Sequence, residues 1–288
     1  MTSPDDLSAP RDLGLYEIKM GLPQPLGPGV VTGEVKVTTI APGAALGPYL
    51  RRFEIVETRA PISRVLLPEP GLILGVRYAG ASRVEGSAAP MGLAVLTGLR
   101  VKARQMATAP ECGVVVAKFT ETGAAAFLDL PLHNLFGAIV PLDELLPPLE
   151  VEQLVEDVRR ASTATEKVMA MERFVSSRLR PRPDPLVLAA TRVLRESRGC
   201  TRIAAVAREL GVSQEVLEKR FRRHVGATPK QFASILRFRR AVAVHRQKQD
   251  LGQLALEAGY YDQAHFNRHF RTITGSAPGA LLTSDAYC

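Results

Sequence analysis

Cysteine is scarce in this chain of 288 residues, and Cys112, Cys200 and Cys288 are far apart and odd in number. The sequence therefore supports neither a disulfide framework nor a cysteine-based zinc module, and a reducing compartment fits it best. No run approaches the ~18 consecutive apolar residues of a membrane span. The first residues are polar and acidic, without the charged segment and apolar core of a secretory signal. We expect a soluble, cytoplasmic protein with no membrane partner.

Motifs of common enzyme classes are also missing. The chain contains no Gly-x-Ser-x-Gly, no phosphate-binding Gly-x-x-x-x-Gly-Lys-Ser/Thr and no His-Glu-x-x-His. His265 and His269 have a zinc-compatible i, i+4 spacing, but the glutamate and a third ligand are lacking. His133 is the only histidine before His224, which disfavours a metal centre in the N-terminal part. We expect no catalytic residue, cofactor or metal, and an enzyme is the least favoured function.

The positive charge is concentrated in the last third of the chain. The net charge is +8, yet residues 1–185 hold 20 Lys and Arg against 21 Asp and Glu. Residues 186–288 hold 17 against 8. Because the excess is local, it indicates a polyanionic partner for the C-terminal part.

The first two thirds change from a strand pattern to a helix pattern. Short apolar, β-branched runs at residues 30–40, 53–58, 72–78, 93–103 and 114–119 alternate with Gly and Pro, which is typical of an antiparallel β-sandwich or barrel. From about 143 to 180, apolar residues recur at helical spacing and predict two amphipathic helices. The pattern does not decide whether these helices pack on the β domain or form a dimer interface.

Three prolines within residues 180–185 predict a linker. We place a β-rich regulatory or oligomerisation domain at 1–180, the linker at 181–185 and an all-α domain at 186–288. The expected fold class is therefore α+β with two domains.

The C-terminal third contains an internal repeat. Ala207-Arg-Glu-Leu-Gly211 is followed by Leu217, Phe221, Gly226 and Pro229, and Ala255-Leu-Glu-Ala-Gly259 is followed by Phe266, Phe270, Gly275 and Pro278. The intervals agree everywhere except between the first Gly and the second apolar residue, where they differ by one. The repeat thus predicts two copies of one structural unit, at about 202–224 and 251–273.

Each copy has the features of a helix, a tight turn and a second helix. Gly211 and Gly259 fit the positive φ at which the first helix ends. Ser213 and Asp262 fit the cap of the second helix, whose apolar pair packs back onto the first. This is the helix-turn-helix arrangement that binds DNA.

A helical stretch predicted at residues 231–248 joins the two copies. Its 18 residues span about 27 Å, which is of the order needed to hold two units near the roughly 34 Å between successive major grooves on one face. The stretch carries Arg237, Arg239, Arg240 and Arg246.

These motifs resemble those of the AraC/XylS family of transcription regulators. The resemblance covers residues 186–282 and is most specific from Gly259-Tyr-Tyr-Asp-Gln-Ala-His-Phe266 to Pro278. Through Leu46-Gly-Pro-Tyr-Leu-Arg-Arg-Phe53 and Val140-Pro-Leu-Asp-Glu-Leu145, the N-terminal part more loosely resembles the poorly understood β-rich regulatory domain of one branch of that family.

The resemblance implies that the second helix of each unit enters a major groove of double-stranded DNA. The expected base-reading residues are Gln214, Glu215, Glu218, Lys219, Gln263, Ala264, His265, Asn267 and Arg268. The expected phosphate contacts are Arg220, Arg222, Arg223, Arg237, Arg240 and Arg271.

The role of the N-terminal domain stays open at this point. It is either a sensor of a small-molecule effector or only a module for homodimerisation or for contact with a protein such as RNA polymerase. A sensor needs an apolar pocket with a few polar groups, whereas an interaction module needs an exposed apolar patch.

Overall fold

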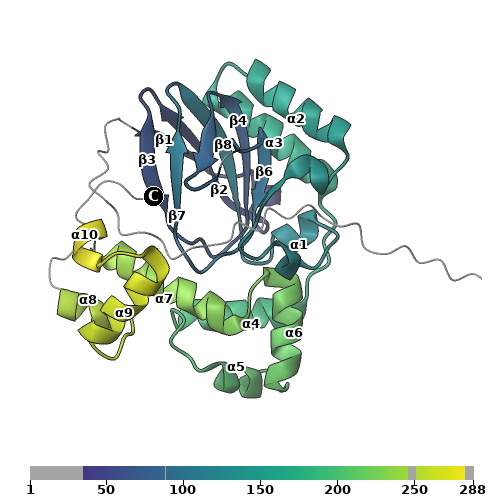
Figure 1. Cartoon of the computed structure of the whole chain (residues 1–288). Coiled ribbons are helices and arrows are strands. Elements are labelled where there is room, and N and C mark those ends of the chain that lie inside the picture. Colours follow the sequence, from purple (N-terminus) through teal and green to yellow (C-terminus); the bar gives the residue numbers. More distant parts are fainter. Residues whose placement is uncertain (1–34, 88, 246–250, 283–288) are drawn as a thin grey trace, which may run out of the picture.

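The N-terminal domain consists of two antiparallel sheets that face each other (Figure 1). The computed structural model describes residues 35–87, 89–245 and 251–282. The larger sheet has the order β1 (Val35–Ile40), β2 (Leu50–Thr58), β8 (Cys112–Phe119), β4 (Ile73–Ala79), β6 (Ala94–Thr97) and β9 (Ile139–Pro141). The smaller sheet has the order β3 (Ile62–Leu66), β7 (Arg104–Thr108) and β5 (Ser82–Val84).

The centre of the larger sheet holds the core of the domain. In β8 and in β2, β-branched and aromatic side chains alternate between buried and partly exposed positions. Val56 of β2 lies opposite Val114 of β8, and Leu74 of β4 lies opposite Ala117. This alternation fixes the register, because a shift by one residue would turn the buried side chains to the other face.

All five predicted β stretches contain a strand, but one prediction extends too far. The part of residues 30–40 before Val35 lies outside the described residues. In 93–103 only Ala94–Thr97 is a strand, because the chain leaves the sheet at Gly98. A Cβ there would lie 1.7 Å from the carbonyl oxygen of Leu135, so the two backbones meet at a glycine. The short strands β3, β5, β7 and β9 were not predicted.

Two helices cover the outer face of the larger sheet (Figure 1). These are α2 (Pro148–Arg160) and α3 (Ala164–Arg178). Val151, Leu154, Val155 and Val158 form the buried stripe of α2, and α3 begins with a capping box formed by Thr163 and Glu166. Both helices therefore pack on the β domain. The shorter helices of this domain are η1 (Ala44–Leu46), α1 (Ala124–Phe127), η2 (Leu132–Leu135) and η3 (Leu142–Glu144).

The described residues after 184 form a helical domain below the sheets (Figure 1). Its helices are α4 (Pro185–Glu196), α5 (Ile203–Glu209), α6 (Gln214–Val225), α7 (Pro229–His245), α8 (Leu251–Glu257), α9 (Gln263–Thr274) and α10 (Pro278–Leu282). The expected fold class is confirmed. Within the described residues, no helix is both long and apolar enough to cross a membrane.

The two halves of the helical domain attach to the β domain differently. The core of α4 to α6 and the first half of α7 is continuous with the core of the β domain. The second half of α7 and the helices α8 to α10 form a separate cluster, to which the β domain contributes Val65 and Leu67. In addition, the amide of Ala103 donates a 2.7 Å hydrogen bond to the carbonyl of Ile273.

Candidate nucleic-acid interface

The first helix-turn-helix unit consists of α5 and α6. Gly211 has φ +68° in the turn between them, as the sequence predicts. The hydroxyl of Ser213 caps α6 by accepting a 3.2 Å hydrogen bond from the amide of Val216. Leu217 and Phe221 are fully buried. One face of α6 is thus fixed in the core, and the other carries its polar side chains.

The second unit, α8 and α9, repeats this arrangement. Gly259 has φ +83°, and the carboxylate of Asp262 accepts a 2.6 Å hydrogen bond from the amide of His265. Phe266 and Phe270 are fully buried. The predicted caps, turns and core positions are therefore present in both copies.

The joining helix α7 packs against both units. The ring centroids of Phe232 and Phe221 lie 5.4 Å apart, and those of Phe238 and Phe270 lie 5.3 Å apart. α7 starts two residues before the predicted stretch, because proline fits the first turn of a helix, and Thr228 and Gln231 cap it reciprocally. The predicted stretch beyond His245, including Arg246, lies outside the described residues.

The predicted base-reading residues lie on the accessible sides of α6 and α9. Asn267 and Glu218 are half-buried, and the others are exposed, namely Gln214, Glu215, Lys219, Gln263, Ala264, His265 and Arg268. Oδ1 of Asn267 has no hydrogen-bond partner among the described residues. Base contact by each of these residues stays a prediction.

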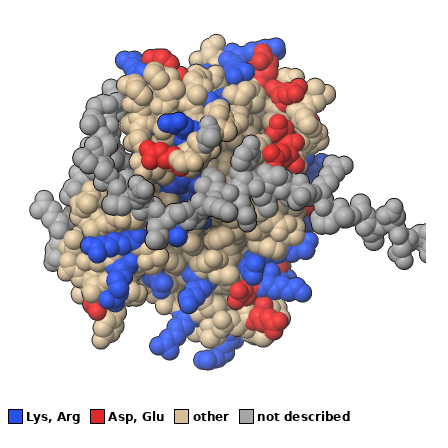
Figure 2. Space-filling view, in the orientation of Figure 1, with Lys and Arg blue, Asp and Glu red and all other residues tan. Residues whose placement is uncertain are grey.

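The predicted phosphate contacts fall into two groups. Arg222, Arg223 and Arg271 are exposed. Arg220 is also exposed, but its guanidinium is engaged by the buried carboxylate of Asp184 at 2.7 Å, and Arg237 donates to the carbonyl of Gly199 at 3.2 Å. Arg240 is half-buried and its Nε has no hydrogen-bond partner among the described residues. The exposed group is the better placed to meet phosphates, and in Figure 2 Lys and Arg outnumber Asp and Glu over the lower half of the molecule.

The β domain reaches the accessible side of α6, which the sequence did not predict. His133 of η2 lines a shallow hollow together with Gln214, Glu215 and Lys219 of α6. At the end of α6, a Cβ on Gly226 would lie 3.1 Å from the carbonyl oxygen of Leu132. The first unit is thus held against the N-terminal domain through its recognition helix.

The two histidines of α9 have different environments. His269 joins α9 to the rest of the domain, since Nε2 lies 2.6 Å from the hydroxyl of Ser234 and Nδ1 lies 2.7 Å from the hydroxyl of Tyr260. Burial lowers the pKa of His269 to about 4, and the charges of Arg237 and His265 act in the same direction. Burial also raises the pKa of Tyr260. Both ring nitrogens of His269 are therefore engaged within the fold.

A basic cavity of about 450 Å³ lies between the two sheets. Arg52 and Lys118, which line it, pair with Glu54 at 2.6 and 2.9 Å. Glu69 pairs with Lys118 at 3.0 Å and, across the domain boundary, with Arg239 of α7 at 3.3 Å. These contacts account for the two carboxylates of the cavity.

Two guanidinium groups of the cavity have no carboxylate partner among the described residues. Arg100 is 7% exposed and donates to the carbonyls of Leu66 and Leu67. Arg104 donates to the carbonyl of Gly137, and Nε of Arg100 and Nη1 of Arg104 are buried without a hydrogen-bond partner in the part of the chain that the structure describes. Burial lowers the pKa of Arg100 to about 9. Sequence analysis missed this site, because Arg100 and Arg104 belong to no recognisable motif and only the folded sheets bring them to one cavity.

The comparisons agree with the helical arrangement. A family model described as a helix-turn-helix domain matches residues 206–284. No curated protein matches the sequence at a significant level.

Several solved structures are similar at low identity. ToxT from Vibrio cholerae is 12% identical, with a TM-score of 0.43 over 87% of this chain and 97% of that chain. The C-terminal domain of the response regulator AraT from Geobacillus stearothermophilus is 21% identical, with a TM-score of 0.33 over 35% of this chain and 87% of that chain. The DNA-binding domain of AdpA, in complex with a target DNA, is 23% identical, with a TM-score of 0.32 over 35% and 91%.

These structural similarities are low, so the family match and the geometry of the two units identify the domain. The C-terminal part of the chain, over residues 206–284, is a helix-turn-helix domain.

Proposed function

We propose that the protein is a DNA-binding transcription regulator that reads two successive major grooves with α6 and α9. The observation that carries this proposal is the pair of recognition helices on one joining helix. Each helix buries an aromatic face against α7 and presents polar side chains on its accessible side. Because α7 fixes the distance between the two units, one protein molecule can place α6 and α9 in two successive major grooves at once.

The chemistry of the accessible side suits base recognition. Gln263 and Asn267 have the amide geometry that pairs with adenine, whereas Arg268 and Lys219 suit guanine. Glu218 can accept a hydrogen bond from cytosine N4. Glu215 stands in the first turn of α6, where a negative charge favours the helix. The two acidic residues make the first unit the weaker reader.

The test is a pull-down of genomic DNA fragments with the purified full-length protein. We expect the bound fragments to share a two-part motif with its halves about one helical turn apart. Salt-sensitive binding of all fragments without a shared motif would instead mean that the basic domain binds nucleic acid without sequence specificity.

The basic cavity favours a sensor role for the N-terminal domain over a pure interaction module. An uncompensated buried guanidinium is costly, and an anionic group in the cavity would compensate both Arg100 and Arg104. The cavity also has apolar walls, including Leu67, Val95 and Ile139. The effector class that fits is therefore a small carboxylate or similar anion with an apolar body.

The cavity residues lie next to the contacts that hold the second DNA-binding unit. Arg100 holds the carbonyl of Leu67, whose side chain packs in the cluster of the second unit. Arg104 follows Ala103, which bonds to Ile273 at the end of α9. Arg239 belongs to α7 itself. An anion bound here would compete with Glu69 for Arg239 and so shift the position of the second unit. The regulator would act in the cytoplasm, with double-stranded DNA as its partner and without a catalytic step.

A further inference from the structure

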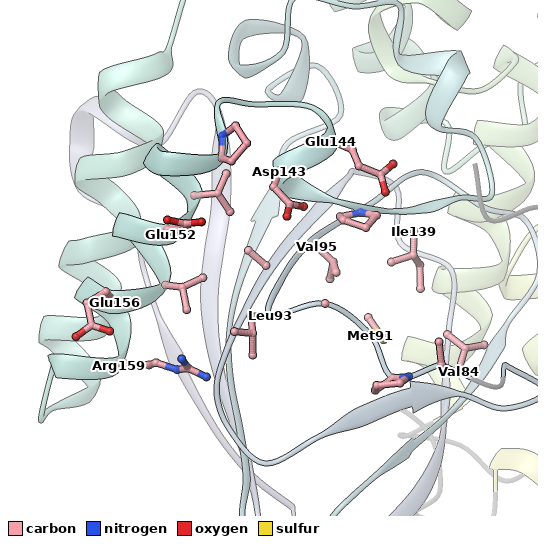
Figure 3. Close-up of a pocket in the computed structure, with 18 of the residues that line it drawn as sticks. Val84, Met91, Leu93, Val95, Ile139, Asp143, Glu144, Glu152, Glu156 and Arg159 are labelled. Carbon is pink, nitrogen blue, oxygen red and sulfur yellow. The ribbon is translucent and has the colours of Figure 1, made fainter. Parts of the chain in front are cut away.

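A second pocket of the N-terminal domain opens beside α2, as the close-up in Figure 3 shows. Its volume is about 820 Å³, and it is lined by α2, η3, strands β6 and β9, and residues 84, 87 and 89–93. The buried stripe of α2 packs on the sheet, and Val151 and Val155 of this stripe also line the pocket. The pocket lies outside the DNA-binding domain.

The walls of the pocket differ in chemistry. Val84, Met91, Leu93, Val95 and Ile139 form an apolar side in Figure 3. Four carboxylates also line the pocket, on Asp143 and Glu144 of η3 and on Glu152 and Glu156 of α2. Among the described residues of the lining, Arg159 is the only Lys or Arg, and it lies at the end of α2 away from Asp143 and Glu144.

Three of the four carboxylates have no ion pair among the described residues. Glu156 pairs with Arg160 at 2.7 Å. Asp143 and Glu144 of η3 and Glu152 of α2 are exposed, and they line the pocket away from Arg159. Like charges that line one pocket repel one another, so a cation bound there would be stabilised by the carboxylates nearest to it.

The lining also limits the type of cation. It contains no Phe, Tyr or Trp, so the aromatic faces that bind quaternary ammonium groups are missing. Carboxylates instead form charge-assisted hydrogen bonds with N–H donors. A primary ammonium, amidinium or guanidinium group therefore fits better than a quaternary one.

We infer that this pocket binds an amphipathic organic cation with N–H donors. The charged head lies against Asp143, Glu144 and Glu152, and the apolar body lies along Met91, Val95 and Ile139. The inference goes beyond the proposed DNA-binding function and does not depend on it.

The cation pocket and the basic cavity are neighbours with opposite charge. Met91, Val95 and Ile139 line both. A site for cations thus adjoins a site for anions, and the sign of a ligand's charge decides which of the two it enters.

The test uses three probes with one apolar body, namely octylammonium, octanol and octanoate. Each is titrated into the full-length protein by isothermal titration calorimetry, below its micelle-forming concentration. We expect octylammonium to bind at least about fivefold more tightly than octanol, since a partly exposed ion pair contributes that much. Equal binding of the two probes, or no binding of octylammonium, would overturn the inference.

Variants locate the bound cation. Glu152→Gln should remove part of the advantage of octylammonium over octanol, and the triple change Asp143→Asn, Glu144→Gln and Glu152→Gln should remove all of it, about fivefold in affinity. Asp157→Asn is the matched control, because Asp157 is on α2 but outside the pocket lining. All the changed residues are near the surface, and unaltered thermal unfolding shows that the variants fold. An unchanged affinity of the triple variant would contradict the proposed site, whereas octanoate binding through Arg104 is not affected by these changes.

Discussion

At the scale of single residues, His269 shows how a polar side chain fixes the second DNA-binding unit. Its ring bonds to Ser234 of α7 and to Tyr260 of the turn before α9. A histidine at this spacing from His265 also fits a zinc site in the sequence, and only the fold shows that both nitrogens have protein partners.

The lowered pKa of His269 predicts a loss of stability in acid. Above pH 6.5 the side chain is neutral in both the folded and the unfolded state. Between pH 6.5 and about 4, His269 binds a proton in the unfolded state but not in the folded state. The free energy of unfolding therefore falls as the pH falls. We expect His269→Gln to reduce this fall, on the order of 1 kcal/mol for a partly exposed group.

The measurement is urea unfolding of the wild type and the variant at pH 7.5 and pH 5. Gln263→Ala is the control, since Gln263 is exposed on the same helix and carries no titrating group. The same pH dependence in the wild type and in His269→Gln would refute this role.

At the scale of elements, the turn glycines allow the two helices of each unit to pack against each other. Gly211 and Gly259 share a positive φ, but their surroundings differ. A Cβ on Gly211 would meet nothing within 4 Å, whereas one on Gly259 would lie 2.2 Å from Sγ of Cys200. An alanine at Gly211 would therefore suffer backbone strain alone, whereas an alanine at Gly259 would suffer the same strain and a steric clash.

We expect Gly211→Ala to lower the free energy of unfolding by about 1 to 2 kcal/mol through strain alone. Gly259→Ala should cost more, because Cys200 must also move. In a Cys200→Ala background the cost of Gly259→Ala should fall to the level of Gly211→Ala. Chemical unfolding of the four variants checks this, and equal costs at the two glycines in the wild-type background would be the contrary result.

Local sequence patterns predict some of these elements and miss others. The caps at Ser213 and Asp262 and the buried pairs Leu217 with Phe221 and Phe266 with Phe270 follow from local spacing, and they were predicted. β7 was not, because Arg104 and Gln105 break the apolar alternation of this short strand. Arg104 faces a charged cavity, so the strand lacks the pattern by which strands are recognised.

At the scale of the whole molecule, the arrangement of the domains was outside the reach of sequence. The core of the first unit is continuous with that of the β domain, and Arg239 of α7 enters the wall of a cavity between two sheets. Such contacts join residues more than a hundred positions apart, and no local pattern encodes them. The two pockets were found only in the structure for the same reason.

If the basic cavity is the sensor site, octanoate should change the affinity of the full-length protein for its DNA severalfold. Arg239→Ala should keep DNA binding but lose this response, because the link to Glu69 is cut. Fluorescence anisotropy with labelled DNA, with and without octanoate, measures both quantities. A response that persists in both Arg239→Ala and Arg104→Ala would exclude the cavity as its origin.

Sequence-specific reading by α9 is the central claim, and a DNA-binding titration of Arg268→Ala and Arg271→Ala tests it most directly. Each variant is titrated at several salt concentrations with the selected motif and with a base-substituted copy. We predict that Arg268→Ala loses about 1 to 3 kcal/mol of discrimination between the two DNAs. Arg271→Ala should weaken both equally and reduce the salt slope by about one. If the wild type binds both DNAs with the same affinity, or Arg268→Ala leaves the discrimination intact, α9 does not read bases as described.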